Sequence, residues 1–121
     1  MLPVMSESIE YIRAGSIRAL AVTSASRSDA LPDLPTLADF VPGFEASNWW
    51  GVCAPKNTPA EIIGTVNKEI NAALASPMIK ARFDDLGSTV FPTSPAAFGK
   101  FIADETEKWG KVVRAANIRA D

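Results

Sequence analysis

The residue best suited to covalent chemistry is the chain's single cysteine, Cys53, which lies in the stretch SNWWGVCAPKNTPAEI, shortly after a pair of tryptophans. Cysteine attacks as a thiolate, which requires a base or a cation nearby, and Lys56 is the only nearby candidate. The same stretch also fits a buried strand that runs into a helix, with cysteine as a small apolar residue. On these residues alone, both interpretations of Cys53 stay open.

The chain contains no histidine, the usual general base at neutral pH and the commonest metal ligand. Cys–His and Ser–His catalysis and most zinc sites are therefore excluded within these residues. One cysteine also excludes an internal disulfide. We expect no catalytic residue, no metal site and no cofactor.

Two charged features remain as candidates for binding. The acidic pair Asp84 and Asp85 lies near a predicted helix end, and we interpret it as solvated surface rather than a metal site. Arg27 could reach a carboxylate ligand, but a cation in a proline-rich loop more often caps carbonyls or pairs with a nearby acid, here Asp29 or Asp33.

Composition places the chain among soluble globular domains, as one domain or one piece of a larger one: it has 121 residues, of which 47% are hydrophobic and 21% charged. Its 12 basic and 14 acidic residues are interspersed and give a net charge of -2. No basic stripe exists for a phosphate backbone, so nucleic acid is not an expected partner. No apolar run could span a bilayer, and the N-terminal residues lack the pattern of a signal peptide.

Three short β-favouring segments predict strands. Residues 17–23 (IRALAVT) form an aliphatic run, residues 46–54 bring Trp49 and Trp50 before Pro55, and residues 88–91 suit a short edge strand. Between the first two, a proline-rich surface connection contains one helical turn at residues 36–40. Adjacent strand residues point to opposite faces, so at most one of the two tryptophans faces a given cleft.

Three helices are predicted from one recurring helix-start motif, a serine or threonine followed by proline. The first covers residues 59–75, with Thr58 as its N-cap and Glu61 completing a capping box. The second covers residues 76–87, with Gly87 as a left-handed stop, and the third covers residues 94–116, with Ser94 as its N-cap. A helix tail also ends at Gly15. The expected class is α/β, a few strands of mixed sheet packed with three to four helices, and the order suggests a chain that starts partway through a larger fold.

From about residue 9 to 118 the chain resembles the substrate-binding receptors of tripartite tricarboxylate transporters, the Bug or TctC-like family, over their C-terminal portion only. The motifs that carry the resemblance are the AGSIRALAVTSASR, LPDLPTLADFVPGF, NWWGVCAPKNTP and FGKFIADETEKWGKVVRAANI segments. Among the matching positions are Gly15, Arg18, Arg27, Pro35, Trp49, Gly51, Pro55, Pro59, Gly87, Phe98, Trp109 and Ile118.

The resemblance implies part of a periplasmic binding protein with two α/β domains that hold a small carboxylate between them. Residues 1–46 would be the remnant of the second receptor domain, residues 47–55 the crossover strand, and residues 56–121 the C-terminal part of the first domain. Cys53 would then occupy an apolar strand position with a structural thiol. Implied partners are a small organic anion and membrane transporter subunits, and the implied location is the periplasm.

Within this portion the resemblance leaves few ligand-binding candidates. Ser6 and Ser8 lie on the approach to the cleft, and Trp49 lies at the domain junction, although Pro3 departs from the family pattern. A second hypothesis is a truncated module without ligand binding, whose uncovered apolar surfaces meet those of another copy by domain swapping or strand pairing. That hypothesis predicts a homo-oligomer.

Overall fold

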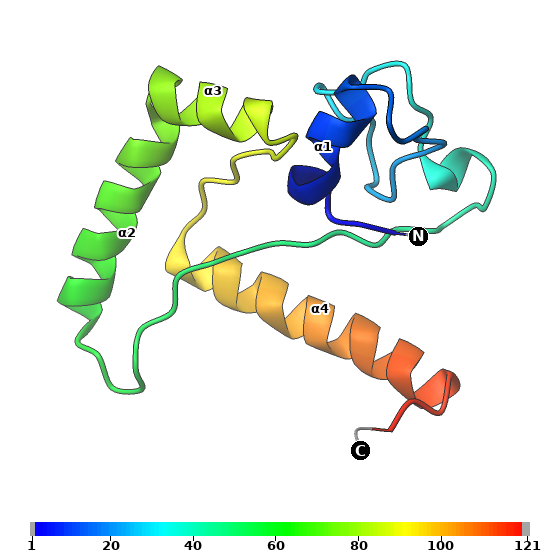
Figure 1. The fold of residues 1–121 in the computed structure, drawn as a ribbon. Coiled ribbons are helices and arrows are strands. Elements are labelled where there is room, and N and C mark those ends of the chain that lie inside the picture. The colour runs from blue at the N-terminus through cyan, green and yellow to red at the C-terminus, as the bar shows by residue number, and fades with distance from the viewer. Residues whose placement is uncertain (1, 120–121) are drawn as a thin grey trace. The chain divides into compact units, whose positions relative to one another are not determined.

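The computed structural model describes residues 2–119 as helices joined by extended segments (Figure 1). In order, the elements are α1 (Met5–Arg13), the short 3-10 helix η1 (Leu37–Asp39), α2 (Ala60–Ala75), α3 (Pro77–Asp85) and α4 (Pro95–Ala115). The chain divides into two compact units. Unit 1 comprises Met1–Cys53 and Ala73–Phe91, and unit 2 comprises Ala54–Ala72 and Pro92–Asp121.

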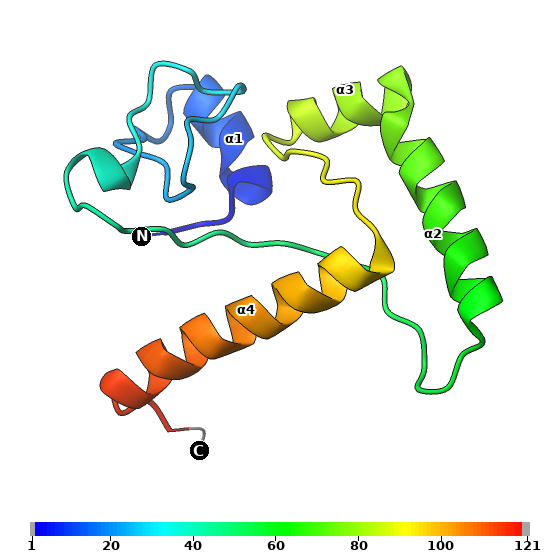
Figure 2. The same ribbon diagram turned by 180° about the vertical axis from the view of Figure 1, so that it is seen from behind.

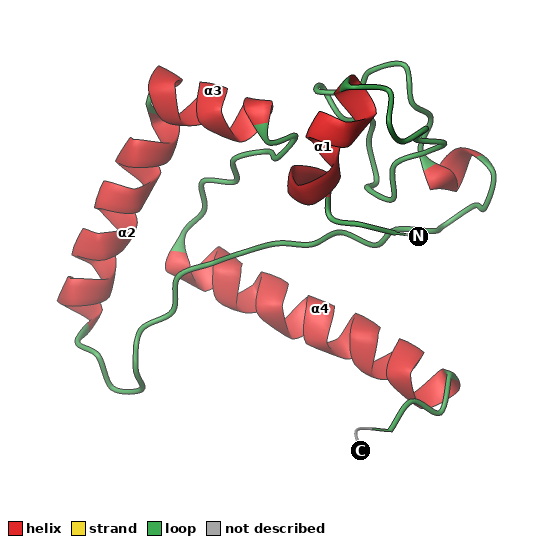
Figure 3. Ribbon diagram, in the orientation of Figure 1, coloured by secondary structure: helices red, strands yellow, loops and turns green. Residues whose placement is uncertain are grey.

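The three predicted strands do not form among residues 2–119, where Figure 3 shows helices and loops alone. Two traces of backbone pairing stand out among the described residues: an isolated parallel bridge joins Val22 and Thr36, and the Ala46 amide donates to the Thr23 carbonyl over 2.9 Å. In this bridge the Val22 amide donates to the Pro35 carbonyl over 2.9 Å, and the Leu37 amide donates to the Val22 carbonyl over 2.8 Å. A strand forms when a neighbouring segment supplies a continuous series of backbone hydrogen bonds, and residues 17–23 make isolated bonds at Val22 and Thr23 instead of a ladder. The predicted mixed sheet is therefore not confirmed.

The predicted helices are confirmed, with starts within one residue or so of those expected. Their caps differ from one another. The Ser94 hydroxyl accepts from the Ala97 amide over 3.2 Å, as predicted, whereas the Ser76 side chain makes no capping hydrogen bond. The predicted capping box at Thr58 was wrong, because α2 begins at Ala60 and the Thr58 hydroxyl donates to the Pro55 carbonyl over 2.8 Å.

Three helices end in the same way, with a residue in the left-handed region directly after the C-cap. These residues are Gly15 (φ 71°), Gly87 (φ 66°) and Asn117 (φ 50°). After α3, the Gly87 amide donates to the Asp84 carbonyl and the Ser88 amide to the Phe83 carbonyl, both over 2.9 Å. This pair of bonds is a Schellman motif, which satisfies carbonyls that the helix leaves free. Both predicted glycine stops are thus confirmed.

Unit 1 has a small interior in which α1 packs on the end of α3. Ile9 and Val22 are its buried apolar residues, and Ser8 and Thr36 are also buried. Gly87 lies directly against the side chains of Met5 and Ile9. Figures 1 and 2 show the proline-rich connection, in cyan, looping beside α1, and its predicted helical turn is η1.

Unit 2 is held together by a side-chain amide. Asn71 on α2 donates to the Thr93 carbonyl over 3.1 Å and accepts from the Thr93 amide over 3.3 Å. Asn67, one turn earlier, donates to the same carbonyl over 2.9 Å. Both backbone groups of Thr93 are therefore satisfied two residues before α4 begins.

The chain exposes more surface than compact bodies of its size. Its accessible surface is 9408 Å², whereas two separate compact bodies with the sizes of units 1 and 2 would expose about 7,600 Å² together. Many large apolar side chains are among the exposed residues. The most exposed are Leu2, Leu20, Phe40, Trp50, Val52, Met78, Phe91 and Ile118.

Candidate functional site

The two predicted serines lie on α1 but point in different directions. They are two positions apart, which separates their side chains by about 200° around a helix. Ser8 is buried, and its hydroxyl donates to the Val4 carbonyl over 3.1 Å. Because its proton is used within the helix, Ser8 does not offer a donor to a carboxylate in this state. Ser6 is partly exposed.

The third predicted residue, Trp49, lies in the extended segment that precedes Pro55. Its side chain is partly covered, with an exposed fraction of 40%, against 73% for Trp50. Cys53, in the same segment, is an exposed free cysteine. Residues 47–55 form no strand within residues 2–119, so the apolar crossover-strand position expected for this thiol stays a prediction.

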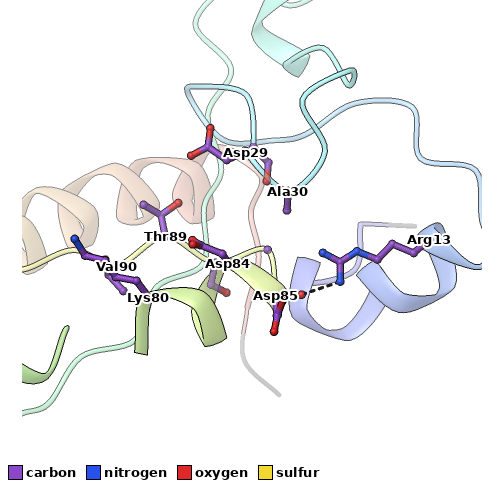
Figure 4. A pocket seen from close by; sticks show the side chains of 11 residues that line it. Arg13, Asp29, Ala30, Lys80, Asp84, Asp85, Thr89 and Val90 are labelled. Carbon is purple, nitrogen blue, oxygen red and sulfur yellow. Dashed lines mark hydrogen bonds between the residues drawn. The ribbon is translucent and has the colours of Figure 1, made fainter. Parts of the chain in front are cut away.

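A depression of about 590 Å³ lies within unit 1, where α1, the proline-rich connection and the end of α3 meet. Its charged lining residues are Arg13, Asp29, Lys80, Asp84 and Asp85. Figure 4 shows the Arg13 side chain reaching the backbone of Asp85, where it donates to the carbonyl over 3.2 Å. Three carboxylates outnumber two cations here, so the depression does not suit a small organic anion.

The remaining charged candidates have structural partners. Arg27 Nη2 lies 3.8 Å from Asp39 Oδ2, so its ion-pair partner is Asp39 rather than the predicted Asp29 or Asp33. Both side chains are about half exposed, which makes the pair weak. Within the described residues, no group of three or more Cys, Asp or Glu side chains is placed to hold a metal ion.

Sequence reasoning missed a polar cluster on α4. Trp109 Nε1 donates to Glu105 Oε2 over 2.9 Å, and Lys108 Nζ lies 3.3 Å from Glu105 Oε1. The same ammonium lies 5.3 Å from the centroid of the Trp109 ring. The four-residue spacing between Glu105 and Trp109 was the signal in the sequence that could have revealed the contact.

None of the helices in residues 2–119 combines the length and the apolar content that crossing a bilayer demands. The depression within unit 1 is open to solvent and lined by more carboxylates than cations, so it identifies no ligand by itself.

Comparison with known proteins gives evidence on the family of the chain, which the geometry alone does not identify. A family model described as tripartite tricarboxylate transporter family receptor matches residues 2–118. Protein BugT of Bordetella pertussis is 42% identical over 112 residues, which cover 92% of this chain and 34% of BugT. A protein of Pseudomonas sp. from the tcbD-tcbE intergenic region is 35% identical over 100% of this chain and 37% of its own length.

Two solved structures share the fold. Rpa4515 of R. palustris, solved with adipate, superposes with a TM-score of 0.84 at 36% identity, over 94% of this chain and 38% of that one. The periplasmic binding protein BugD superposes with a TM-score of 0.83 at 32% identity, over 94% of this chain and 39% of that one. The chain spans little more than a third of the length of BugT and of the Pseudomonas relative. Its fold is that of part of a periplasmic binding protein, and it belongs to the tripartite tricarboxylate transporter receptor family.

Proposed function

We propose that this chain is the carboxyl-terminal part of a solute-binding receptor that holds a small organic carboxylate between two domains and delivers it to membrane transporter subunits. It acts in the periplasm and catalyses no reaction. The observation that carries the proposal is the family match over residues 2–118. The adipate in the structure of the relative Rpa4515 supports a carboxylate as the ligand class.

The predicted domain assignment fits this proposal. Residues 1–46 belong to the second receptor domain, residues 47–55 cross over, and residues 56–121 complete the first domain. Extended segments that form no ladder within the described residues, such as residues 17–23, gain further strand partners in the rest of a receptor. The exposure of Leu20 (70%) and Val52 (69%) supports this, because both are β-favouring apolar residues left uncovered.

Ser6 and Trp49 are the proposed ligand contacts within this portion. Both side chains retain some exposure, and a hydroxyl and an indole can each donate one hydrogen bond to a carboxylate. Ser8, the third predicted contact, reaches a ligand only after its bond to the Val4 carbonyl breaks. Two donors are few for a carboxylate, so the chain by itself should bind the anion weakly or not at all.

The test compares the 121-residue chain with a chimera that joins it to the amino-terminal two thirds of BugT. Calorimetric titration with adipate and a panel of di- and tricarboxylates should show binding by the chimera with a dissociation constant on the order of micromolar, and no resolvable heat for the chain alone. Ser6→Ala in the chimera should weaken binding, while the matched variant Ser26→Ala, in an exposed loop, should not.

Two outcomes would contradict the proposal. A folded chimera, monodisperse and helical by circular dichroism, that binds none of the carboxylates would overturn the receptor assignment. Micromolar binding by the 121-residue chain alone would overturn the claim that most ligand-gripping groups lie outside it.

Self-association without ligand binding is the second candidate function. The exposed surface favours it, because at least about 1,800 Å² is uncovered beyond what compact units of these sizes would show. The exposed residues include many large apolar side chains, and apolar side chains that are contiguous on a surface mark interaction sites.

A further inference from the structure

Asp39, in η1, satisfies the backbone amide of a buried residue. Its Oδ2 accepts from the Thr36 amide over 3.1 Å. Thr36 is only 6% exposed, so water does not readily replace this acceptor. The Asp39 side chain itself is 49% exposed. A carboxylate at the surface thus holds a donor in the small interior of unit 1.

Thr36 is also the point at which the proline-rich connection closes on itself. It bridges Val22, whose amide donates to the Pro35 carbonyl and whose carbonyl accepts from the Leu37 amide. Residues 23–35 therefore form a loop whose two ends meet, which is the geometry of an Ω-loop. Because unit 1 buries few apolar side chains, the closure of this loop depends largely on these hydrogen bonds.

The closed loop also holds the chain just before Trp49. Thr23, the residue after Val22, accepts at its carbonyl from the Ala46 amide over 2.9 Å. Ala46 precedes Trp49 by three residues, and three residues of extended chain reach about 10 Å. Opening the loop at Thr36 frees Val22 and, with it, the neighbouring peptide group that holds Ala46. The position of Trp49 therefore depends on the loop being closed.

We infer that Asp39 is a positioning residue for Trp49: by holding the Thr36 amide it keeps the loop closed, and the closed loop fixes the segment that carries the indole. The inference rests on the proposed function in one respect, that Trp49 contacts the carboxylate ligand. The Arg27–Asp39 ion pair adds little, because its atoms are 3.8 Å apart and both side chains are about half exposed. The role of position 39 is therefore to supply an acceptor rather than a charge.

Hydrogen exchange in the 121-residue chain tests the inference without a ligand. Asp39→Ala removes the acceptor and should accelerate exchange at the Thr36 and Ala46 amides roughly tenfold, because the loop opens more often. Exchange at the Gly87 amide, in the contact between α1 and α3 of the same unit, should not change. Asp39→Asn keeps an acceptor oxygen and should restore most of the protection. The matched control Asp33→Ala removes an exposed carboxylate from the same loop and should change none of the three amides.

Fluorescence reports on the indole directly. With Trp50 and Trp109 replaced by phenylalanine, Trp49 is the sole tryptophan, and its ring is partly covered. Its quenching by acrylamide should rise in Asp39→Ala and stay at the wild-type level in Asp39→Asn and in Asp33→Ala. In the chimera, Asp39→Ala should raise the dissociation constant of adipate several-fold, because the free protein then holds the indole less firmly in place.

Four results would overturn the inference. They are unchanged exchange at Ala46 in Asp39→Ala, unchanged quenching of Trp49, no recovery in Asp39→Asn, and acceleration at Gly87 equal to that at Ala46. The last would mean that Asp39 stabilises unit 1 as a whole rather than the loop. A folded chimera that binds no carboxylate would overturn the receptor proposal alone, because exchange and quenching measure the positioning of Trp49 without ligand.

Discussion

The indole of Trp109 is anchored to Glu105, one turn earlier on α4, by a hydrogen bond of 2.9 Å. A charge-assisted bond of this kind holds the ring in one rotamer and keeps a carboxylate inside an apolar stripe. The ammonium of Lys108 lies over the same ring, 5.3 Å from its centroid.

Glu105→Ala should release the Trp109 ring. With Trp49 and Trp50 replaced by phenylalanine, Trp109 is the sole tryptophan, and its quenching by acrylamide should rise in Glu105→Ala at low protein concentration. Loss of the bond should lower the stability of α4 by about 1 kcal/mol. Glu107→Ala removes an exposed carboxylate that pairs with Lys111 and should change neither quantity measurably. Equal quenching in the two variants would contradict the anchoring role.

Gly87→Ala should destabilise unit 1 more than Gly15→Ala does. Both glycines have positive φ, 66° and 71°, so both substitutions carry the backbone cost of about 1–2 kcal/mol. A Cβ at Gly87 would in addition collide with Met5 Cγ and lie 3.0 Å from Ile9 Cδ1, whereas one at Gly15 meets nothing within 4 Å. Thermal unfolding followed by circular dichroism compares the two.

The origin of that difference can be isolated with a third substitution. Met5→Ala in the Gly87→Ala background should recover part of the lost stability, because it removes the side chain that the new Cβ meets. In the Gly15→Ala background it should recover nothing. A double-mutant cycle without coupling between positions 5 and 87 would show that the close approach costs nothing.

Asn71→Ala should loosen the start of α4. The substitution leaves the amide of Thr93 without its acceptor and removes one of two donors to the Thr93 carbonyl, at a cost of about 1–3 kcal/mol. Asn67→Ala removes the other donor alone and should cost less. Hydrogen exchange at the Thr93 amide is the most direct measurement, and it should accelerate in Asn71→Ala but not in Asn67→Ala. The reverse order would contradict the assignment.

The parts of the fold that could be predicted are those that the chain determines locally. The stop at Gly87 and the cap at Ser94 each depend on residues within one helical turn, and both formed as expected. Strands depend on partners distant in sequence. Residues 17–23 are β-favouring, yet they form no ladder and make only isolated backbone bonds, from Val22 to Pro35 and Leu37 and from Thr23 to Ala46. The same limit hid the contact of Asn71 with Thr93, which joins residues 22 positions apart.

The candidate site was less predictable than the helices, for a related reason. Sequence alone placed Ser6 and Ser8 on one approach to a cleft, but it could not show that the Ser8 hydroxyl turns back to the Val4 carbonyl. It likewise could not show whether anything covers Cys53, which is exposed. Where a side chain points depends on what packs against it, and for much of this chain that packing is absent from the described residues.

Ser94→Ala and Ser76→Ala provide a last test. The sequence predicts an N-cap at both serines, but only Ser94 makes a capping hydrogen bond in the structure. Each serine precedes a proline at the start of a helix, but only Ser94 has a hydroxyl that accepts from a helix amide, that of Ala97. Removing this acceptor should cost about 1 kcal/mol, since the amide of Ala97 then loses its partner in the first turn. Ser76→Ala should cost a few tenths of a kcal/mol at most, because its side chain makes no capping bond. Thermal unfolding of both variants by circular dichroism measures the difference, and equal losses would mean that the two caps work alike in solution.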